Sequence, residues 1–270
     1  MLRKLLKHEF RATGRTMLPL YLILLVTAVG ANLSTRKLLE SGEGLVSLLG
    51  GLLIMAFAIA MAAVCIMSVV VMVQRFYKSL LQDEGYVMMT LPVSVHQHVW
   101  AKLITSAVWF ALTILAVILS CCIMAYEQGA VKWFFRGLAD LFHEITTYYA
   151  INSAALVLEF LLACFVGCCV MCLEFYAALA VGHSRPNHKM AFSVGAFFVM
   201  QFALEFLMGV IGNLLDWTGV MDVFRGFTVN LSGMTTLHVA MLGLAAVSVL
   251  VGAVYYGVTV WFLKHKLNLE

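Results

Sequence analysis

Charged residues are scarce in this chain of 270 residues: they make up 11% of it, whereas hydrophobic residues make up 63%. A soluble domain is about half apolar and a quarter charged, so the composition excludes a soluble globular protein and indicates a polytopic membrane protein. The net charge of +3 is small. Nothing in it points to nucleic acid, and we expect no nucleic-acid partner.

The common sequence motifs of enzymes are also missing. The chain has no Gly-x-x-x-x-Gly-Lys-Ser/Thr, the loop that cradles nucleotide phosphates. It has neither His-Glu-x-x-His nor Gly-x-Ser-x-Gly, which mark two classes of hydrolase. The seven cysteines lie inside apolar runs and are odd in number, so they form no disulfide framework. We expect a chain that is not an enzyme and holds no metal or cofactor of its own.

What the sequence does have is long apolar runs. Six candidate spans occur, at residues 17–33, 45–73, 103–125, 151–181, 190–213 and 239–263. As helices they are long enough to cross a hydrocarbon core of about 30 Å. The sequence therefore predicts an all-α protein with six transmembrane helices, organised as one transmembrane domain over residues 1–270.

The distribution of Lys and Arg predicts the orientation of these spans. With the N-terminus inside, twelve of the 17 Lys and Arg residues fall in cytoplasmic segments and five in outer loops. Cytoplasmic loops carry the excess of positive charge in membrane proteins. Six spans then place both termini in the cytoplasm.

Two further helices are expected to lie on the membrane surface. In residues 1–15, apolar positions recur with helical spacing among Lys and Arg, which is typical of a basic amphipathic helix at the inner headgroup layer. The outer loop 126–149 carries a stripe of Phe, Leu and Ile with flanking aromatics. Here we expect an interfacial helix, with a lid over a pathway as the alternative.

The loop 74–102 between the second and third spans is rich in polar residues. Gly85 and Pro92 break it into short helical pieces. Ser94 suits the N-cap of the helix that leads into the third span, and Lys102 is expected to extend to the inner headgroups. The prediction is a short helix parallel to the membrane that projects its polar residues into the cytosol; the alternative is an ordinary solvated loop.

Three stretches of this loop, Glu84-Gly85-Tyr86, Leu91-Pro92-Val93-Ser94 and Ala101-Lys102-Leu103, resemble the corresponding loop of ABC-2 type transporter permeases. Val87 and Met88 stand where that family commonly has an acidic residue. The first ten residues are similar to small permeases of Gram-positive bacteria, and the six spans with internal termini extend the resemblance over nearly the whole chain.

The resemblance implies a permease subunit of an ABC exporter in a bacterial cytoplasmic membrane. It implies a coupling helix seated on a separate ATPase subunit, which would bind ATP and Mg²⁺, and a second permease copy, identical or related. The expected substrate is an amphipathic peptide, drug or lipid-like molecule. The residues that would contact the ATPase are Gln82, Asp83, Glu84, Gly85, Tyr86, Met89, Leu91 and Pro92.

Several polar residues interrupt the spans. Glu159 and Glu205 fall at similar depth in the outer half of consecutive helices, and Gln201 lies one turn from Glu205. A carboxylate in the bilayer needs a partner or water. These three residues either border an outward-facing substrate path or hydrogen-bond to one another in a packed bundle. Glu174 is expected near the inner surface, where solvation is cheap.

Two other classes of function are alternatives to an ABC exporter. An ion-coupled secondary transporter is expected to show inverted repeats and broken helices, and the sequence displays neither. An intramembrane enzyme is expected to carry one of the missing motifs. The sequence does not identify the substrate or the direction of transport.

Overall fold

The computed structural model of the chain describes residues 2–35, 44–82, 85, 90, 93–126, 130–148, 153–185, 188–222, 226 and 233–266. Within these ranges the structure contains long helices and no β-strand. The helices are α1 (Leu2–Leu33), α2 (Gly44–Leu80), α4 (Val95–Met124), α5 (Ala130–Tyr148), α6 (Ser153–Gly182), α7 (Lys189–Trp217) and α9 (Gly233–His265). The predicted all-α fold is confirmed.

Six of these helices are long and apolar enough to cross a membrane, which confirms the predicted number of spans. The apolar segments are Arg3–Leu33, Leu48–Leu80, Val95–Met124, Ala154–Gly182, Lys189–Trp217 and Thr236–His265. Each includes most of one predicted span and continues beyond it at one or both ends. The protein is accordingly a multi-pass, all-α membrane protein.

The chain divides into two compact units, which are described separately. The first unit comprises Met1–Arg75 and Trp100–Asp140, and the second comprises Phe76–Val99 and Leu141–Glu270. Both α2 and α4 contribute residues to each unit.

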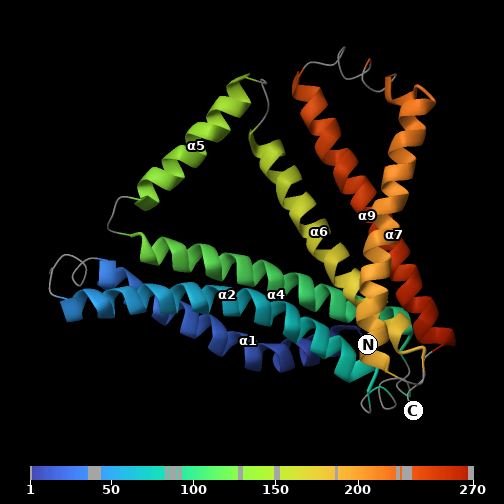
Figure 1. Cartoon of the computed structure of the whole chain (residues 1–270), viewed down its shortest axis with the longest axis horizontal. Helices are drawn as coiled ribbons and strands as arrows, with labels where there is room; N and C mark the ends of the chain where they lie inside the picture. Colours follow the sequence, from blue (N-terminus) through green and yellow to red (C-terminus); the bar gives the residue numbers. More distant parts are fainter. Residues whose placement is uncertain are drawn as a thin grey trace. The chain divides into compact units, whose positions relative to one another are not determined.

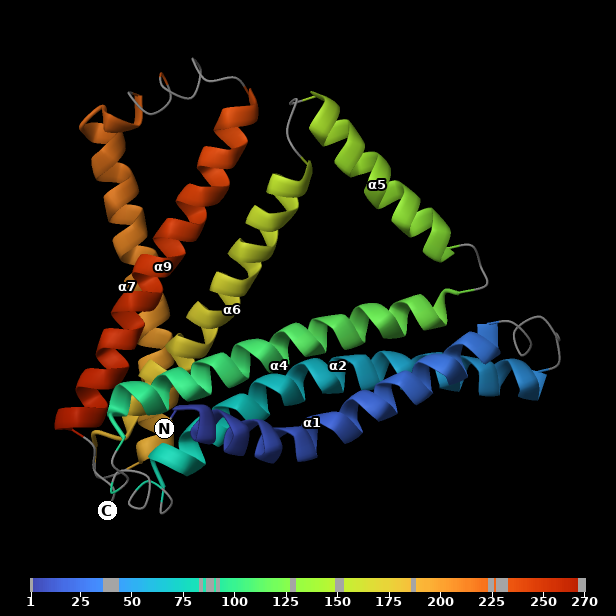
Figure 2. The ribbon, with the colours of Figure 1, turned by 180° about the vertical axis from the view of Figure 1, so that it is seen from behind.

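In the first unit α1, α2 and α4 run side by side (Figures 1 and 2). Small and branched side chains of α1 pack against Phe57 and Val64 of α2 to form its buried core. Hydrogen bonds also join α1 to α4: among them, the Tyr21 hydroxyl lies 2.7 Å from the Thr113 hydroxyl, and the Asn32 amide donates to the Met124 carbonyl over 2.9 Å. Such bonds supplement close packing where lipid supplies no hydrophobic driving force between helices.

A buried ion network also holds this unit together. The Glu9 carboxylate of α1 is 3% exposed and accepts a hydrogen bond of 2.8 Å from the Lys102 ammonium of α4. Arg75 of α2 lies 3.4 Å from the other carboxylate oxygen. The expectation that Lys102 extends to the headgroups is therefore wrong: its ammonium is buried, because Glu9 supplies a counter-charge inside the unit.

The first two spans belong to longer helices than the sequence indicated. α1 is one helix over the expected surface segment 1–15 and the first span together, and α2 continues two turns beyond residue 73. Polar residues with good helix propensity do not end a helix by themselves, so the boundaries drawn at Arg15 and Gln74 do not appear. The membrane-surface position of residues 1–15 stays a prediction.

In the second unit α6 packs against both α7 and α9. α6 and α9 run in the same direction, because residues that meet advance together along both: Glu159 bonds to His238, and a side-chain atom on Gly252 would lie 3.2 Å from Val170. α7 begins where α6 ends and returns antiparallel to it (Figures 1 and 2).

The predicted amphipathic helix in the outer loop is confirmed as a helix, α5. Trp133, Phe135, Leu138 and Leu141 are exposed on it. Large apolar side chains left open to the surroundings agree with a helix that lies on a membrane, as expected for this segment. Its location in the outer interface stays a prediction.

Candidate functional site: the polar loop and its anchors

The loop between the second and third spans is described at both of its ends. α2 ends at Leu80, and the Gly85 amide then donates a hydrogen bond of 2.7 Å to the Gln82 carbonyl. Ser94 was predicted as an N-cap, and α4 begins directly after it at Val95, with the Gln97 amide 3.4 Å from the Ser94 hydroxyl. The other residues expected to contact an ATPase lie outside the described residues: Asp83, Glu84, Tyr86, Met89, Leu91 and Pro92.

The first end of the loop is anchored on α6 by stacked aromatic rings. Phe76, in the last turns of α2, lies parallel to Tyr176 of α6 with 4.0 Å between ring centroids and 8° between ring planes. Both side chains are almost completely buried, at 0% and 1% exposure. Leu80, one turn further along α2, is buried as well. The start of the loop is thus packed into the second unit through these buried side chains.

The neighbouring Tyr77 extends this anchor to the end of α6. Its ring meets the imidazole of His183 edge-on, with 5.1 Å between centroids. His183 Nδ1 lies 2.9 Å from the Leu179 carbonyl, which can only accept a hydrogen bond, so Nδ1 carries the proton. Burial lowers the pKa of His183, the nearby Lys189 lowers it further, and the bond to Leu179 opposes them. A neutral ring therefore suits this position.

The second end of the loop is anchored on α9 through His96, at the start of α4. His96 Nε2 lies 3.1 Å from the Lys264 ammonium, which can only donate. Nδ1 must then be the protonated nitrogen, and it donates to the Tyr256 hydroxyl over 2.7 Å. No pattern in the sequence predicts this role for His96. Its ring joins the loop to two residues near the end of the last helix.

The three residues of the candidate substrate path are not joined to one another. Glu159 of α6 pairs with His238 of α9, whose Nδ1 lies 2.7 Å from both carboxylate oxygens. Among the described residues no hydrogen bond or ion pair links Glu159 to Gln201 or Glu205. Gln201 is half-buried and Glu205 exposed on α7. The mutual hydrogen bonds offered as an alternative do not form in this structure, and a substrate path at these residues stays a prediction.

His238 is a partner that sequence reasoning missed. It was placed in a loop before the sixth span, whereas the apolar segment of α9 already begins at Thr236. Glu159 and His238 are each near the start of a helix that begins at the same end of the unit. Matching ionisable residues by their distance from the helix start would have paired them.

Glu174 departs from expectation in a different way. It was placed where water would solvate it, but its side chain is packed between helices and only 7% of the residue is exposed. In the part of the chain that the structure describes, its Oε1 atom has no hydrogen-bond partner, and neither has the hydroxyl of Tyr255. A carboxyl group buried this way is an ionisable site within the spanning bundle.

These contacts indicate what the site can do. Two aromatic anchors and one histidine anchor fix the ends of a polar loop to α6 and α9, so that a force on the loop would act on both helices. Among the described residues no group of three or more His, Cys, Asp or Glu side chains could hold a metal ion. No family model, curated protein or solved structure matches the chain.

Proposed function

We propose that this protein is the membrane-spanning subunit of an ABC exporter in a bacterial cytoplasmic membrane. A separate ATPase subunit would hydrolyse ATP with Mg²⁺, and a second permease copy would complete the transporter. The resemblance of residues 84–103 to ABC-2 permeases supports this function. The six spans support it too, as does the lack of a nucleotide-binding motif in the sequence.

The observation that carries the proposal is the anchoring of both ends of the loop in one compact unit. Phe76 and Tyr77 attach its start to α6, and His96 attaches its end to Tyr256 and Lys264 of α9. A solvated loop without a mechanical role has no need of a fully buried aromatic stack at its base. An element that must transmit force has that need, because slack at its base would absorb the movement.

In this mechanism ATP binding draws the two ATPase subunits together and displaces the loop. The displacement passes through the anchors to α6 and α9, which run parallel and move as a pair. The movement would reach the hydrogen bond between Glu159 of α6 and His238 of α9, which lies at the opposite end of these two helices from the loop anchors. Export would follow from alternation of this end between closed and open states, with Gln201 and Glu205 on the substrate path.

The direct test is co-purification of the full-length chain from membranes of its source. A soluble protein with ATPase activity should co-purify with the wild-type chain. Glu84→Lys and Gly85→Pro should abolish the association while leaving membrane insertion unchanged. Glu144→Lys, the same charge reversal on α5, is the matched control, because the Lys and Arg distribution places α5 on the outer face. Recruitment of the ATPase by both loop variants would refute the proposal.

The alternative is an ion-coupled secondary transporter. One observation favours it: Glu159 with His238, and the buried Glu174, put protonatable groups at two depths of the same helix. Transport in vesicles separates the two functions. Export that continues when a protonophore collapses the proton gradient and stops when ATP is depleted supports the exporter, and the reverse result supports the secondary transporter.

A further inference from the structure

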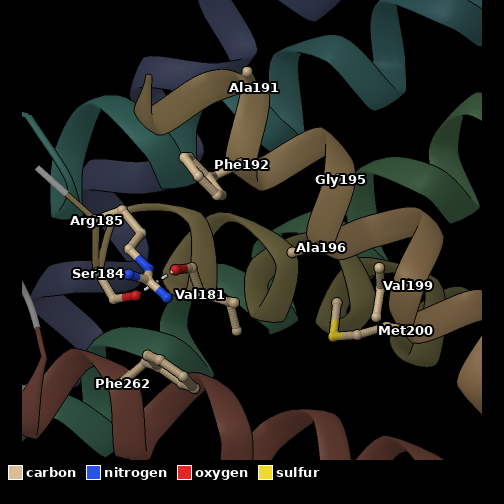
Figure 3. Close-up of a pocket in the computed structure, with 10 residues that line it drawn as sticks. All are labelled: Val181, Ser184, Arg185, Ala191, Phe192, Gly195, Ala196, Val199, Met200 and Phe262. Atoms are coloured by element: carbon tan, nitrogen blue, oxygen red, sulfur yellow. Dashed lines mark hydrogen bonds between the residues drawn. The ribbon is translucent and has the colours of Figure 1, made fainter. Parts of the chain in front are cut away.

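The second unit contains a cavity of about 730 Å³ at the junction of α6, α7 and α9 (Figure 3). The cavity is lined by Val181 at the end of α6, Arg185 in the segment after α6, Phe192 and Met200 of α7, and Phe262 of α9. None of these residues belongs to the loop anchors or to the candidate substrate path.

The lining combines apolar walls with one cationic group. Among the described residues that line the cavity, Arg185 alone is charged. Its guanidinium carbon lies 6.0 Å from the centre of the Phe192 ring, a distance at which the ring face attracts a cation. The Ser184 hydroxyl is directed back to the Val181 carbonyl at 2.7 Å. The cavity thus offers a positive charge at one position and hydrocarbon elsewhere, as the side chains in Figure 3 illustrate.

The cavity is placed where lipid would reach it. The Lys and Arg distribution puts the segment after α6, which carries Arg185, on the cytoplasmic side. Phe192 and Val199 are 50% and 66% exposed, so this part of α7 opens to the surface that faces the bilayer. The two positions are seven residues apart, which corresponds to a rise of about 10 Å along a helix. An apolar wall therefore extends from the inner headgroup level toward the acyl chains.

We propose that this cavity binds one anionic phospholipid of the inner leaflet, with its phosphate on Arg185 and an acyl chain along Phe192, Val199 and Phe262. A guanidinium matches the geometry of a phosphate and forms two parallel charge-assisted hydrogen bonds with it. Basic pockets between membrane helices on the cytoplasmic side suit anionic headgroups. A free phosphate ion would leave the apolar walls unused, whereas a phospholipid satisfies both parts of the site.

Gly195 is a position at which a substitution can fill the cavity. It lines the cavity, and an added Cβ would meet no atom within 4 Å, so a larger side chain at this position fills the cavity without disturbing the helix packing. Gly209 lies on the same helix, has the same open surroundings and is not part of the lining. Gly195→Leu and Gly209→Leu therefore form a matched pair.

The experiment is native mass spectrometry of the purified full-length protein with phosphatidylglycerol, phosphatidylcholine or glycerol phosphate. The wild type should bind one phosphatidylglycerol in preference to phosphatidylcholine. Arg185→Gln should weaken phosphatidylglycerol binding at least about tenfold, as expected for hydrogen bonds to a charged group. Lys266→Gln, an equal loss of charge near the end of the chain, should not. Gly195→Leu should reduce binding of both lipids, and Gly209→Leu of neither.

Equal binding of the two lipids by the wild type would overturn the proposal, and so would an unchanged preference in Arg185→Gln. Displacement of the lipid by an equal concentration of glycerol phosphate would show that only the headgroup is bound, which contradicts the role given to the apolar walls. Arg185→Lys keeps the charge without the paired donors and should retain part of the preference. Lipid binding by Arg185→Lys would show that a substitution at Arg185 leaves the protein folded.

Discussion

The stack of Phe76 on Tyr176 allows the coupling role of the loop anchors to be measured. We consider Phe76→Leu, Tyr176→Leu and the double variant, since leucine keeps apolar bulk but cannot stack. The rings are parallel, 4.0 Å apart and fully buried. Aromatic pairs contribute about 0.5–1.5 kcal/mol beyond the area they bury. A double-mutant cycle should therefore give a coupling energy of about 1 kcal/mol, roughly a fivefold change in the unfolding equilibrium.

Equilibrium unfolding in mixed detergent micelles measures this energy, and the reconstituted transporter measures its consequence. Phe76→Leu should lower the amount of substrate exported per ATP hydrolysed, because a looser anchor dissipates movement of the loop. The matched control is Phe197→Leu. Phe197 of α7 stacks on Phe175 of α6 at 5.1 Å and 9° in the same unit, and neither ring is part of the stack that Phe76 forms with Tyr176. Both of these rings are only half-buried, so Phe197→Leu should destabilise the protein less than Phe76→Leu, and it should leave the export ratio unchanged.

Two results would refute this reasoning. A coupling energy below about 0.3 kcal/mol, the usual error of additivity, would mean that the rings do not stabilise one another. An equal fall in the export ratio for Phe76→Leu and Phe197→Leu would mean that general destabilisation, and not a loosened loop, impairs transport.

Three further predictions concern stability. Glu9→Gln should lower the free energy of unfolding by about 3–5 kcal/mol, because it leaves the buried Lys102 ammonium without its counter-charge. The double variant Glu9→Gln with Lys102→Met should recover much of that loss. The pKa of His183 is lower in the folded state than in the unfolded state, so the unfolded state binds more protons. The contribution of His183 to stability should therefore be fully present above a pH of about 6.5 and be lost as the pH falls through the folded-state pKa. His183→Gln should remove this part of the pH dependence of the melting temperature. Gly182→Ala should destabilise by about 1–3 kcal/mol because its Cβ would collide with Ser193 of α7. Gly167→Ala, where the space is open, should have no such effect in the same assay.

Hydropathy was sufficient to predict the membrane spans. A run of about 20 apolar residues is long enough to cross the bilayer, and a helix satisfies all of its backbone hydrogen bonds there. It was insufficient for the helix ends. The first turns of α1 are polar in sequence, yet Glu9 is buried there with its charge neutralised by residues of two other helices. A local pattern cannot show this compensation, since the three residues are brought together only by packing.

The candidate site shows the same division between local and tertiary information. Ser94 was predicted as an N-cap because the motif acts over three residues. The partners of Phe76, His96 and His183 could not be found from the sequence, because the contacts join positions far apart in the chain. Glu159 was recognised as a residue in need of a partner, but the partner was sought on α7 and lies on α9.

The ion network of the first unit has a consequence for biogenesis. Glu9 leaves the ribosome 66 residues before Arg75 and 93 residues before Lys102. At synthesis rates of about 5–20 residues per second, its carboxylate waits roughly 5–20 s for the ammonium that neutralises it. During that interval the start of the chain has to stay in contact with water, so we expect Glu9 to become buried only after the first turns of α4 have been synthesised.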